Sequence, residues 1–125
     1  RARLFETALG YPDLDAFLAA EWEESFGSLR AANLYTQAMT WQEADISGGG
    51  DLAAALSSIT ARVLLMPGET DLYFRVADNE AELEHLRHGE LAVIPSVWGH
   101  RAGSPAGIPA DEEFLTRTVR EFLDR

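Results

Sequence analysis

The chain has 125 residues, with 21 acidic and 10 basic side chains and a net charge of −11 at neutral pH. This charge argues against nucleic acid and against an anionic membrane surface as partners, and no apolar run approaches the roughly 18 residues of a membrane span. The absence of cysteine excludes disulfides, a thiol nucleophile and thiolate zinc sites. No charged-then-apolar leader follows Arg1, so we expect a cytoplasmic protein, and the lack of an initiating Met suggests a piece of a longer one.

Residues 1–47 are predicted to form helices. Apolar side chains recur three and four residues apart between residues 17 and 26, and no alternating or β-branched run competes with that pattern. Asp13 is suited to begin a helix, and Gly27 interrupts the periodicity. The aromatic side chains of this half are more than two or three short helices can cover, so we expect these helices to need a partner surface. The glycines at 48–50 read as a flexible linker.

The second half, 48–125, alternates between helix and strand signals. In chain order it predicts a short helix capped by Asp51, an apolar strand at 62–66, a helix over 78–87, a second apolar strand at 91–94, and a last helix capped by Asp111. Short unbroken apolar runs are typical of parallel strands that are buried on both faces, and helical crossovers join such strands. A sheet usually has about four to six strands. Two strands therefore predict that an N-terminal portion of the sheet lies outside this chain.

A polar residue follows each predicted strand. Asp71 comes after the first strand and His100 after the second. Because the carboxyl ends of parallel strands meet at one edge of a sheet, we expect the two side chains to lie close together. An acid that orients a histidine, and a histidine that moves a proton, are two of the three groups of acyl-transfer catalysis. The alternative is a turn-forming aspartate and a packed histidine without a catalytic role.

A nucleophile for such a pair is missing from the sequence. No Gly-x-Ser-x-Gly motif is present. Ser104 lacks the flanking glycines, and Ser96 stands four residues before His100 on the same predicted loop rather than on a strand-to-helix elbow. We therefore expect the isolated chain to be inactive.

Three segments together resemble a known family. GETDLYF at 68–74 and IPSVWGHRAG at 94–103 resemble the C-terminal part of α/β-hydrolases similar to homoserine O-acetyltransferase, and TWQEADIS at 40–47 resembles the end of that family's helical lid. The resemblance implies an α/β fold that is the incomplete, C-terminal portion of an α/β-hydrolase. Residues 1–47 would be the helical lid or cap segment. Residues 48–125 would be the C-terminal α/β core segment, with the last two parallel strands and their flanking helices.

The same resemblance implies a serine-dependent acyltransferase. Asp71 would be the acid and His100 the base of a Ser-Asp-His triad, with the serine upstream of this chain. The implied partners are the missing N-terminal part of the fold and a small-molecule acyl donor and acceptor, with acetyl-CoA as donor substrate and no cofactor. Arg75 and Arg101 depart from the transferase pattern and count against homoserine as the acceptor. An esterase or other hydrolase is the alternative, and the choice depends on whether water is excluded from the site.

Other candidate sites are weaker. Tyr35 and Trp41 could line a substrate tunnel under the lid, although ordinary helix packing explains them as well. His85 and His88 stand three residues apart but lack a third ligand, so we predict no metal site. A second class of function is a noncatalytic interaction module, in which the helices of residues 1–47 bind a partner or form a homodimer.

Overall fold

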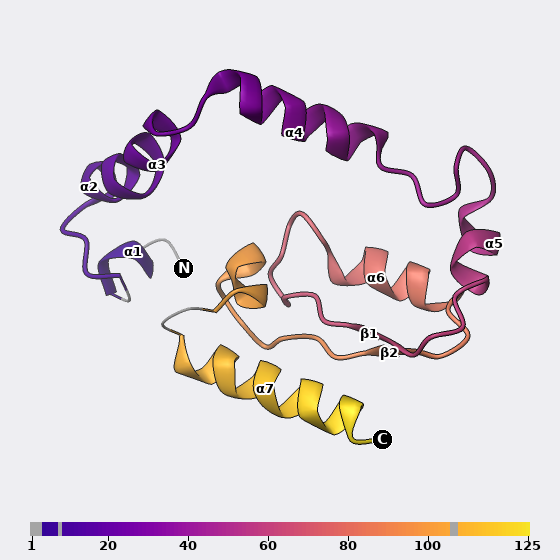
Figure 1. Ribbon diagram of the computed structural model, residues 1–125. Helices are drawn as coiled ribbons and strands as arrows, with labels where there is room; N and C mark the ends of the chain where they lie inside the picture. The colour runs from indigo at the N-terminus through magenta and orange to yellow at the C-terminus, as the bar shows by residue number, and fades with distance from the viewer. Residues whose placement is uncertain (1–3, 8, 106–107) are drawn as a thin grey trace. The chain divides into compact units, whose positions relative to one another are not determined.

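The computed structural model describes residues 4–7, 9–105 and 108–125. It divides into two compact units, Arg1–Asp45 and Ile46–Arg125, which are described separately below (Figure 1). The division lies close to the predicted boundary between 47 and 48. Whether the first unit acts as a lid stays a prediction.

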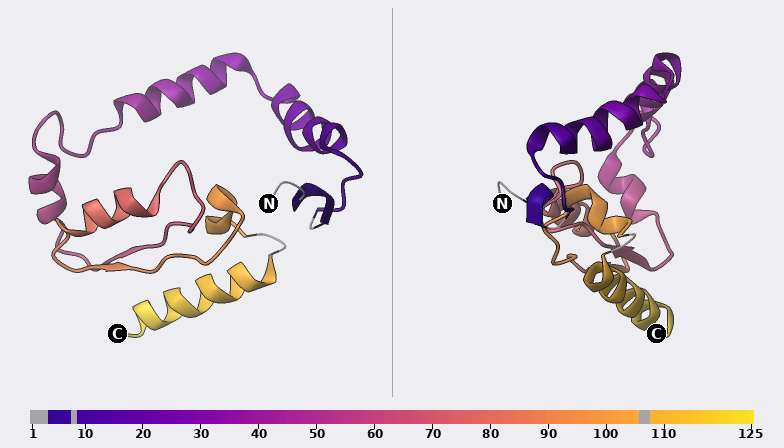
Figure 2. Two further views of the ribbon diagram at one scale, coloured as in Figure 1. Left: turned by 180° about the vertical axis from the view of Figure 1, so that it is seen from behind. Right: turned by 90° about the vertical axis from the view of Figure 1, so that its left-hand side faces the viewer.

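In the first unit, the regular elements of the described part are all helices. Its elements are α1 (Leu4–Thr7), α2 (Leu14–Leu18), η1 (Ala19–Glu23), α3 (Glu24–Gly27) and α4 (Ala31–Glu43). The elements α2, η1 and α3 follow one another without a break and make one helix, in which η1 is a π-helical turn (Figure 2). The predicted start is confirmed, since the Asp13 carboxylate accepts a hydrogen bond of 2.8 Å from the backbone N–H of Ala16.

Large aromatic side chains remain exposed in this unit. Trp22 and Phe26 stack with their ring centroids 5.7 Å apart, one helical turn from each other, yet about half of each side chain stays accessible. Residues 6–7 and 9–45 of the first unit include no buried residue. Stacking of neighbours on a single helix covers only one face of each ring, so these aromatics retain apolar area that other surfaces could cover.

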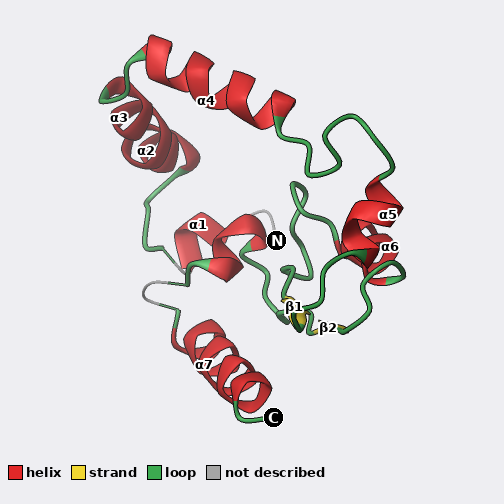
Figure 3. Ribbon diagram, turned by 45° about the vertical axis from the view of Figure 1, so that its right-hand side comes forward, coloured by secondary structure: helices red, strands yellow, loops and turns green. Residues whose placement is uncertain are grey.

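The second unit holds the sheet. Its elements are α5 (Leu52–Ser57), β1 (Val63–Leu65), α6 (Val76–Leu83), β2 (Gly89–Leu91), η2 (Gly99–Gly103) and α7 (Pro109–Leu123). Strands β1 and β2 are parallel, with Val63 opposite Gly89 and Leu65 opposite Leu91. A further parallel bridge joins Gly68 to Ile94 beyond the strand ends. Figure 3 shows how short the strands are among the helices, and they are the only two strands in the described ranges.

Helices α6 and α7 lie on opposite sides of this strand pair (Figures 1 and 2). At one end of α7 the side chain of Asp111 contacts that of Ser96. At the other end the guanidinium of Arg125 contacts the Glu90 carboxylate in β2 at 2.6 Å. Near the same end the guanidinium carbon of Arg62, just before β1, lies 4.1 Å from the ring centroid of Phe122 in α7. The helix therefore runs alongside the strands over their whole length.

Several predicted boundaries and burials were wrong. The strands are half-buried rather than buried on both faces, and within the described chain they pair only with each other. The second strand forms at Gly89–Leu91 rather than 91–94, although Ile94 is fully buried in the added bridge. The helix predicted over 78–87 is α6, which ends at Leu83. It starts earlier because Arg75 pairs with Asp78 across the first turn.

The predicted caps of the two remaining helices had opposite outcomes. Asp51 caps α5 as predicted, since its carboxylate accepts from the N–H groups of Ala53 and Ala54. Asp111 is not a cap, because α7 begins at Pro109 and Asp111 lies inside its first turn. Proline suits a first helical turn, where its missing N–H costs nothing. None of the helices described here has the length and apolar character to cross a membrane.

Candidate active site

The acid of the site lies in the loop after β1. Backbone hydrogen bonds hold the start of this loop, since the N–H of Glu69 donates to the carbonyl of Ile94 at 2.9 Å. The Asp71 carboxylate is almost buried. Its Oδ1 accepts from the N–H groups of Tyr73 at 2.7 Å and Phe74 at 3.2 Å. The carboxylate thus shapes the loop that follows it, and Oδ2 is left for another donor.

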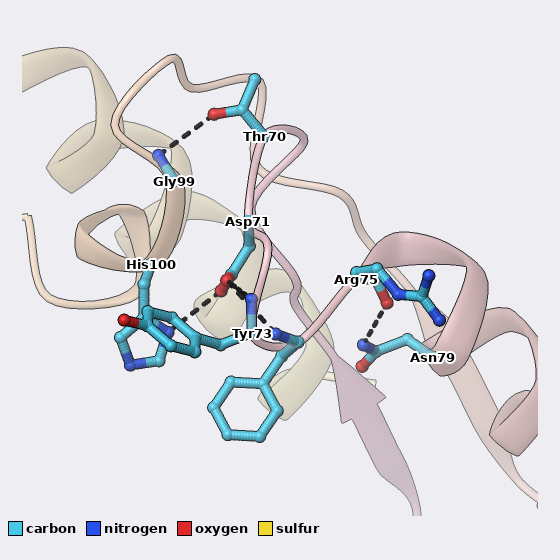
Figure 4. A network of polar contacts seen from close by, with 8 residues as sticks. Thr70, Asp71, Tyr73, Arg75, Asn79, Gly99 and His100 are labelled. Atoms are coloured by element: carbon cyan, nitrogen blue, oxygen red, sulfur yellow. Dashed lines mark hydrogen bonds and ion pairs between the residues drawn. The ribbon is translucent and has the colours of Figure 1, made fainter.

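That donor is His100, in η2. Its Nδ1 lies 3.0 Å from Oδ2 of Asp71 (Figure 4). An ionised carboxylate can only accept hydrogen bonds, so Nδ1 carries the proton and donates a hydrogen bond to Oδ2. This leaves Nε2 as the basic nitrogen. The sequence predicts these two side chains to be within hydrogen-bond reach, and the structure places them there. Their catalytic role stays a prediction.

The pKa of Asp71 lies below its ordinary value. Burial of the carboxyl group raises the pKa, because it disfavours the charged form. The hydrogen bonds from His100, Tyr73 and Phe74, together with the positive charge of a protonated His100, outweigh burial. Asp71 is therefore ionised at neutral pH and can stabilise an imidazolium on His100.

Two aromatic rings flank the imidazole. The ring centroid of Tyr73 is 5.2 Å from that of His100 in an edge-on arrangement, and the Phe74 centroid is 5.3 Å away. Both rings come from the acid loop, two and three residues after Asp71, so this loop supplies an apolar wall as well as the carboxylate. More than half of the His100 side chain remains exposed, which leaves it able to meet a reacting group.

A second set of polar groups, whose contacts with one another are not predictable from the sequence, fixes the loop that carries the base. The Thr70 hydroxyl donates to the carbonyl of Ser96 at 3.0 Å and accepts from the N–H of Gly99 at 3.1 Å. The buried Ser96 hydroxyl donates to the Asp111 carboxylate at 2.6 Å. A hydroxyl that bridges two loops leaves no periodic signal in the sequence. The only available clue was that Thr70 stands next to Asp71.

The loops also approach each other closely through glycine. A Cβ on Gly68 would lie 2.8 Å from the carbonyl oxygen of Gly99, closer than such atoms can come. Gly99 itself has φ +58°, a left-handed conformation that favours glycine. Gly99 immediately precedes His100, so the base enters the site from a turn that depends on this residue.

A hollow of about 270 Å³ borders the acid–base pair. Asp71, His100 and Phe74 line it together with the end of β1 and the residues after it, Leu65, Met66 and Pro67. The mixture of apolar walls and two convergent polar groups is typical of small-molecule sites. A larger hollow of about 490 Å³ runs along the charged face of α7 and contains none of these groups.

The remaining sequence candidates are not part of this arrangement. Tyr35 and Trp41 are both on α4 in the first unit, with 68 % and 61 % of their surfaces exposed, and their role in substrate binding stays a prediction. His85 and His88 lie between α6 and β2 and are exposed. Across the residues that the structure describes, no group of three His, Cys, Asp or Glu side chains could hold a metal ion.

Comparison with known proteins identifies similar sequences among esterases. A probable esterase of Corynebacterium glutamicum is 37 % identical over 94 residues, and an ethyl acetate hydrolase of Pseudomonas veronii is 35 % identical over 95 residues. Each alignment includes 74 % of this chain but 27 % of the relative, so the chain spans about a quarter of the length of these curated proteins. No protein-family model matches the chain.

The similar solved structures are also those of esterases. An acetylester hydrolase from Corynebacterium glutamicum superposes with a TM-score of 0.84 at 30 % identity. The acetyl esterase MekB gives a TM-score of 0.87 at 31 % identity. Both matches cover 94 % of this chain and 34 % of the other structure.

These relatives support a hydrolase and give no support to the resemblance to homoserine O-acetyltransferase. The alternative reading of the sequence, an esterase, is therefore better supported than the acyltransferase. The chain is a mixed helix–strand polypeptide with a parallel strand pair. It superposes on about one third of the length of each of the two esterase structures.

Proposed function

We propose that this chain supplies the acid and the base of a serine esterase that hydrolyses short-chain carboxylic esters. The observation that carries the proposal is the contact of 3.0 Å between His100 Nδ1 and Asp71 Oδ2, formed where two parallel strands end. The similarity to an ethyl acetate hydrolase, an acetylester hydrolase and an acetyl esterase supports acetyl esters as the substrate class. The serine comes from polypeptide outside these 125 residues.

In this function His100 moves the protons and Asp71 orients it. Nε2 of His100 takes the proton of the serine hydroxyl as the serine oxygen bonds to the acyl carbon of the ester. The same proton then passes to the departing alcohol oxygen. Water attacks the acyl-serine, again giving its proton to Nε2, and the carboxylic acid leaves as the serine regains a proton from His100. Throughout, the ionised Asp71 holds the imidazole in one tautomer and stabilises its cation.

The test uses the protein made from the complete reading frame that contains this sequence. Hydrolysis of p-nitrophenyl acetate and of ethyl acetate is measured for the parent and for the variants His100→Ala and Asp71→Asn. We expect kcat to fall by about 10⁶-fold for H100A and about 10⁴-fold for D71N, in line with triads in general. The matched controls His85→Ala and Asp78→Asn change the same residue types at exposed positions of the same unit and should leave kcat unchanged.

Two further measurements separate the alternatives. A serine-directed fluorophosphonate probe should label the complete protein at a serine outside these 125 residues, and labelling of Ser96 or Ser104 would contradict that part of the proposal. Acetyl transfer from acetyl-CoA to an alcohol, measured beside hydrolysis, distinguishes the acyltransferase from the esterase. Undiminished hydrolysis by H100A would rule out the proposed function and favour the noncatalytic interaction module.

A further inference from the structure

The two loops that carry Asp71 and His100 are tied together in two different ways. Up to Glu69 the tie is a backbone ladder, in which the N–H of Ile94 donates to the carbonyl of Pro67 and the N–H of Glu69 donates to the carbonyl of Ile94, both at 2.9 Å. The next tie along the chain is made by a side chain, that of Thr70. The ladder of the parallel strands is thus prolonged by one hydroxyl group.

That hydroxyl holds both ends of the turn in front of the base. Thr70 Oγ1 donates to the carbonyl of Ser96 at 3.0 Å and accepts from the N–H of Gly99 at 3.1 Å; Figure 4 shows the second bond beside the acid–base pair. A hydroxyl can donate and accept at once, so one atom fixes two points of the turn. Thr70 directly precedes Asp71 and Gly99 directly precedes His100, so each tie lies one residue from a functional side chain.

The turn is anchored from its other side as well. The Ser96 hydroxyl accepts from the N–H of Trp98 at 3.2 Å and donates to the carboxylate of Asp111 in α7 at 2.6 Å. Ser96 and Asp111 are only 3 % and 5 % exposed, so water does not compete for these bonds. The Ser96 hydroxyl thus joins the base-bearing turn to α7, and the Thr70 hydroxyl joins the same turn to the acid loop.

We propose that Thr70 is a positioning residue, whose hydroxyl sets the separation between the acid loop and the base loop and so keeps His100 within hydrogen-bond distance of Asp71. The inference rests on the proposed function, which gives that distance its importance. Thr70 touches neither the substrate nor a reacting atom in this role. The need for such a tie follows from Gly99, because a glycine at φ +58° leaves the backbone before His100 with unusual freedom.

The decisive variants differ only in the hydroxyl. Thr70→Val removes it while keeping the shape of the side chain, and Thr70→Ser keeps it while removing the methyl group. In the complete protein, with p-nitrophenyl acetate, we expect T70V to lower kcat by roughly 10- to 100-fold with KM changed by less than about twofold, since misplacing a catalytic group by about 1 Å has an effect of this size. T70S should restore kcat to within about threefold of the parent.

Ser57→Ala is the matched control. The Ser57 hydroxyl also bonds a distant carbonyl, that of His85 at 3.1 Å, but it does so before the strands begin rather than after they end. Its removal should leave kcat and KM unchanged. A loss in S57A equal to that in T70V would mean that any bridging hydroxyl of this unit matters, and would overturn the proposal.

Two readouts do not depend on activity. Amide hydrogen exchange at Gly99 should accelerate in T70V and stay slow in T70S, because the hydroxyl is the acceptor of that N–H. The low-field proton resonance of a His100 Nδ1–H bound to a carboxylate should weaken or vanish in T70V alone. If T70V does not fold, Thr70→Ala replaces it in the same comparison with T70S.

The outcomes keep the two proposals apart. Inactive H100A together with parental kcat and an unchanged Nδ1–H resonance in T70V would overturn the positioning role and leave the esterase proposal intact. Equal losses in T70V and T70S would also overturn it, because the hydroxyl would not be the cause. Fully active H100A would overturn both proposals.

Discussion

The two units of this chain stabilise their side chains by different means. In the described part of Ile46–Arg125 the buried groups include Asp71, Ser96 and Asp111, each held by directional hydrogen bonds, beside the apolar side chains of Leu56, Ile94 and Ala102. In the first unit, residues 6–7 and 9–45 include no buried residue, and four large aromatics stay exposed, namely Trp22, Phe26, Tyr35 and Trp41. In the second unit the loops of the acid–base site are thus joined by polar contacts beside a small buried apolar set.

The largest expected loss of stability in the second unit comes from filling the space between the two site loops. Gly68→Ala places a Cβ 2.8 Å from the Gly99 carbonyl oxygen and 3.2 Å from the Ala102 Cβ. Both are parts of the chain that cannot swing aside, so we expect a loss of about 3 kcal/mol in the free energy of unfolding, the upper range for overpacking. Urea unfolding of the complete protein, followed by circular dichroism, measures it.

Gly27→Ala is the control in the first unit. Nothing lies within 4 Å of a Cβ there, and its φ is not positive. We expect a gain of roughly 0.4–1 kcal/mol, because alanine restricts the unfolded chain. Equal effects of the two substitutions would show that the two units are packed alike, contrary to the comparison above.

Removal of hydroxyl groups gives the next largest contrast. Ser96→Ala leaves the buried Asp111 carboxylate without its donor, and we expect a loss of about 2 kcal/mol of stability. In the first unit the Thr36 hydroxyl donates to the Ala32 carbonyl at 2.9 Å on an exposed helix face, where water can replace it. Thr36→Val should change stability by less than about 0.5 kcal/mol. Thermal unfolding of both variants tests the difference, and a neutral S96A would contradict it.

Acidification should affect the second unit through Asp71. Its native pKa lies below the ordinary value of 3.8, so the native state prefers the carboxylate more than the unfolded chain does. The resulting stability is fully present above that ordinary value and is lost as the pH falls through the lower native pKa. At pH values below about 4 we expect the urea concentration at the unfolding midpoint of the parent to decrease. In Asp71→Asn this decrease should be smaller.

Asp78 provides the comparison for this pH dependence. Its pKa is also lowered, chiefly by the hydrogen bond from Arg75, but the pair is exposed and therefore screened by water and salt. Asp78→Asn should alter the pH dependence less than D71N does, and high salt should reduce that small effect further. An identical pH dependence in parent and D71N would contradict the role assigned to the Asp71 contacts.

The smallest expected effect concerns the first unit and substrate. If Trp41 lines a substrate tunnel under a lid, Trp41→Ala should raise KM for p-nitrophenyl acetate by about fivefold, which corresponds to about 1 kcal/mol of lost apolar contact, with kcat little changed. Tyr35→Ala should act in the same direction. Trp22→Ala, at a half-exposed position of the same unit, is the control. Unchanged KM in both W41A and Y35A would remove the predicted tunnel.

Local features of the fold were predictable, and tertiary ones were not. Asp13 and Asp51 cap helices as their sequence positions predict, because capping involves only the next two or three residues. Asp111 looked equivalent but is drawn to Ser96, fifteen residues away. The start of α6 is an exception, because it was missed although the Arg75–Asp78 pair that organises its first turn is local.

The candidate site divides along the same line. Asp71 and His100 could be named from the sequence because each follows an apolar strand, and parallel strands bring their ends together. Thr70, Gly99 and the Ser96–Asp111 pair could not, since their importance lies in distances between loops that a single sequence does not contain. The half-burial of β1 and β2 was also missed, because an apolar run predicts a strand but does not say how much of it neighbouring elements cover.

The open side of β1 has a consequence for handling the chain. Among the residues described, β1 (Val63–Leu65) pairs with β2 alone, so its other edge presents peptide groups that any extended segment can bind. If no further strand covers that edge, separate molecules are prone to aggregate edge to edge. The net charge of −11 opposes this by mutual repulsion. Salt screens that repulsion, so the chain made alone should precipitate more readily at high ionic strength than at low.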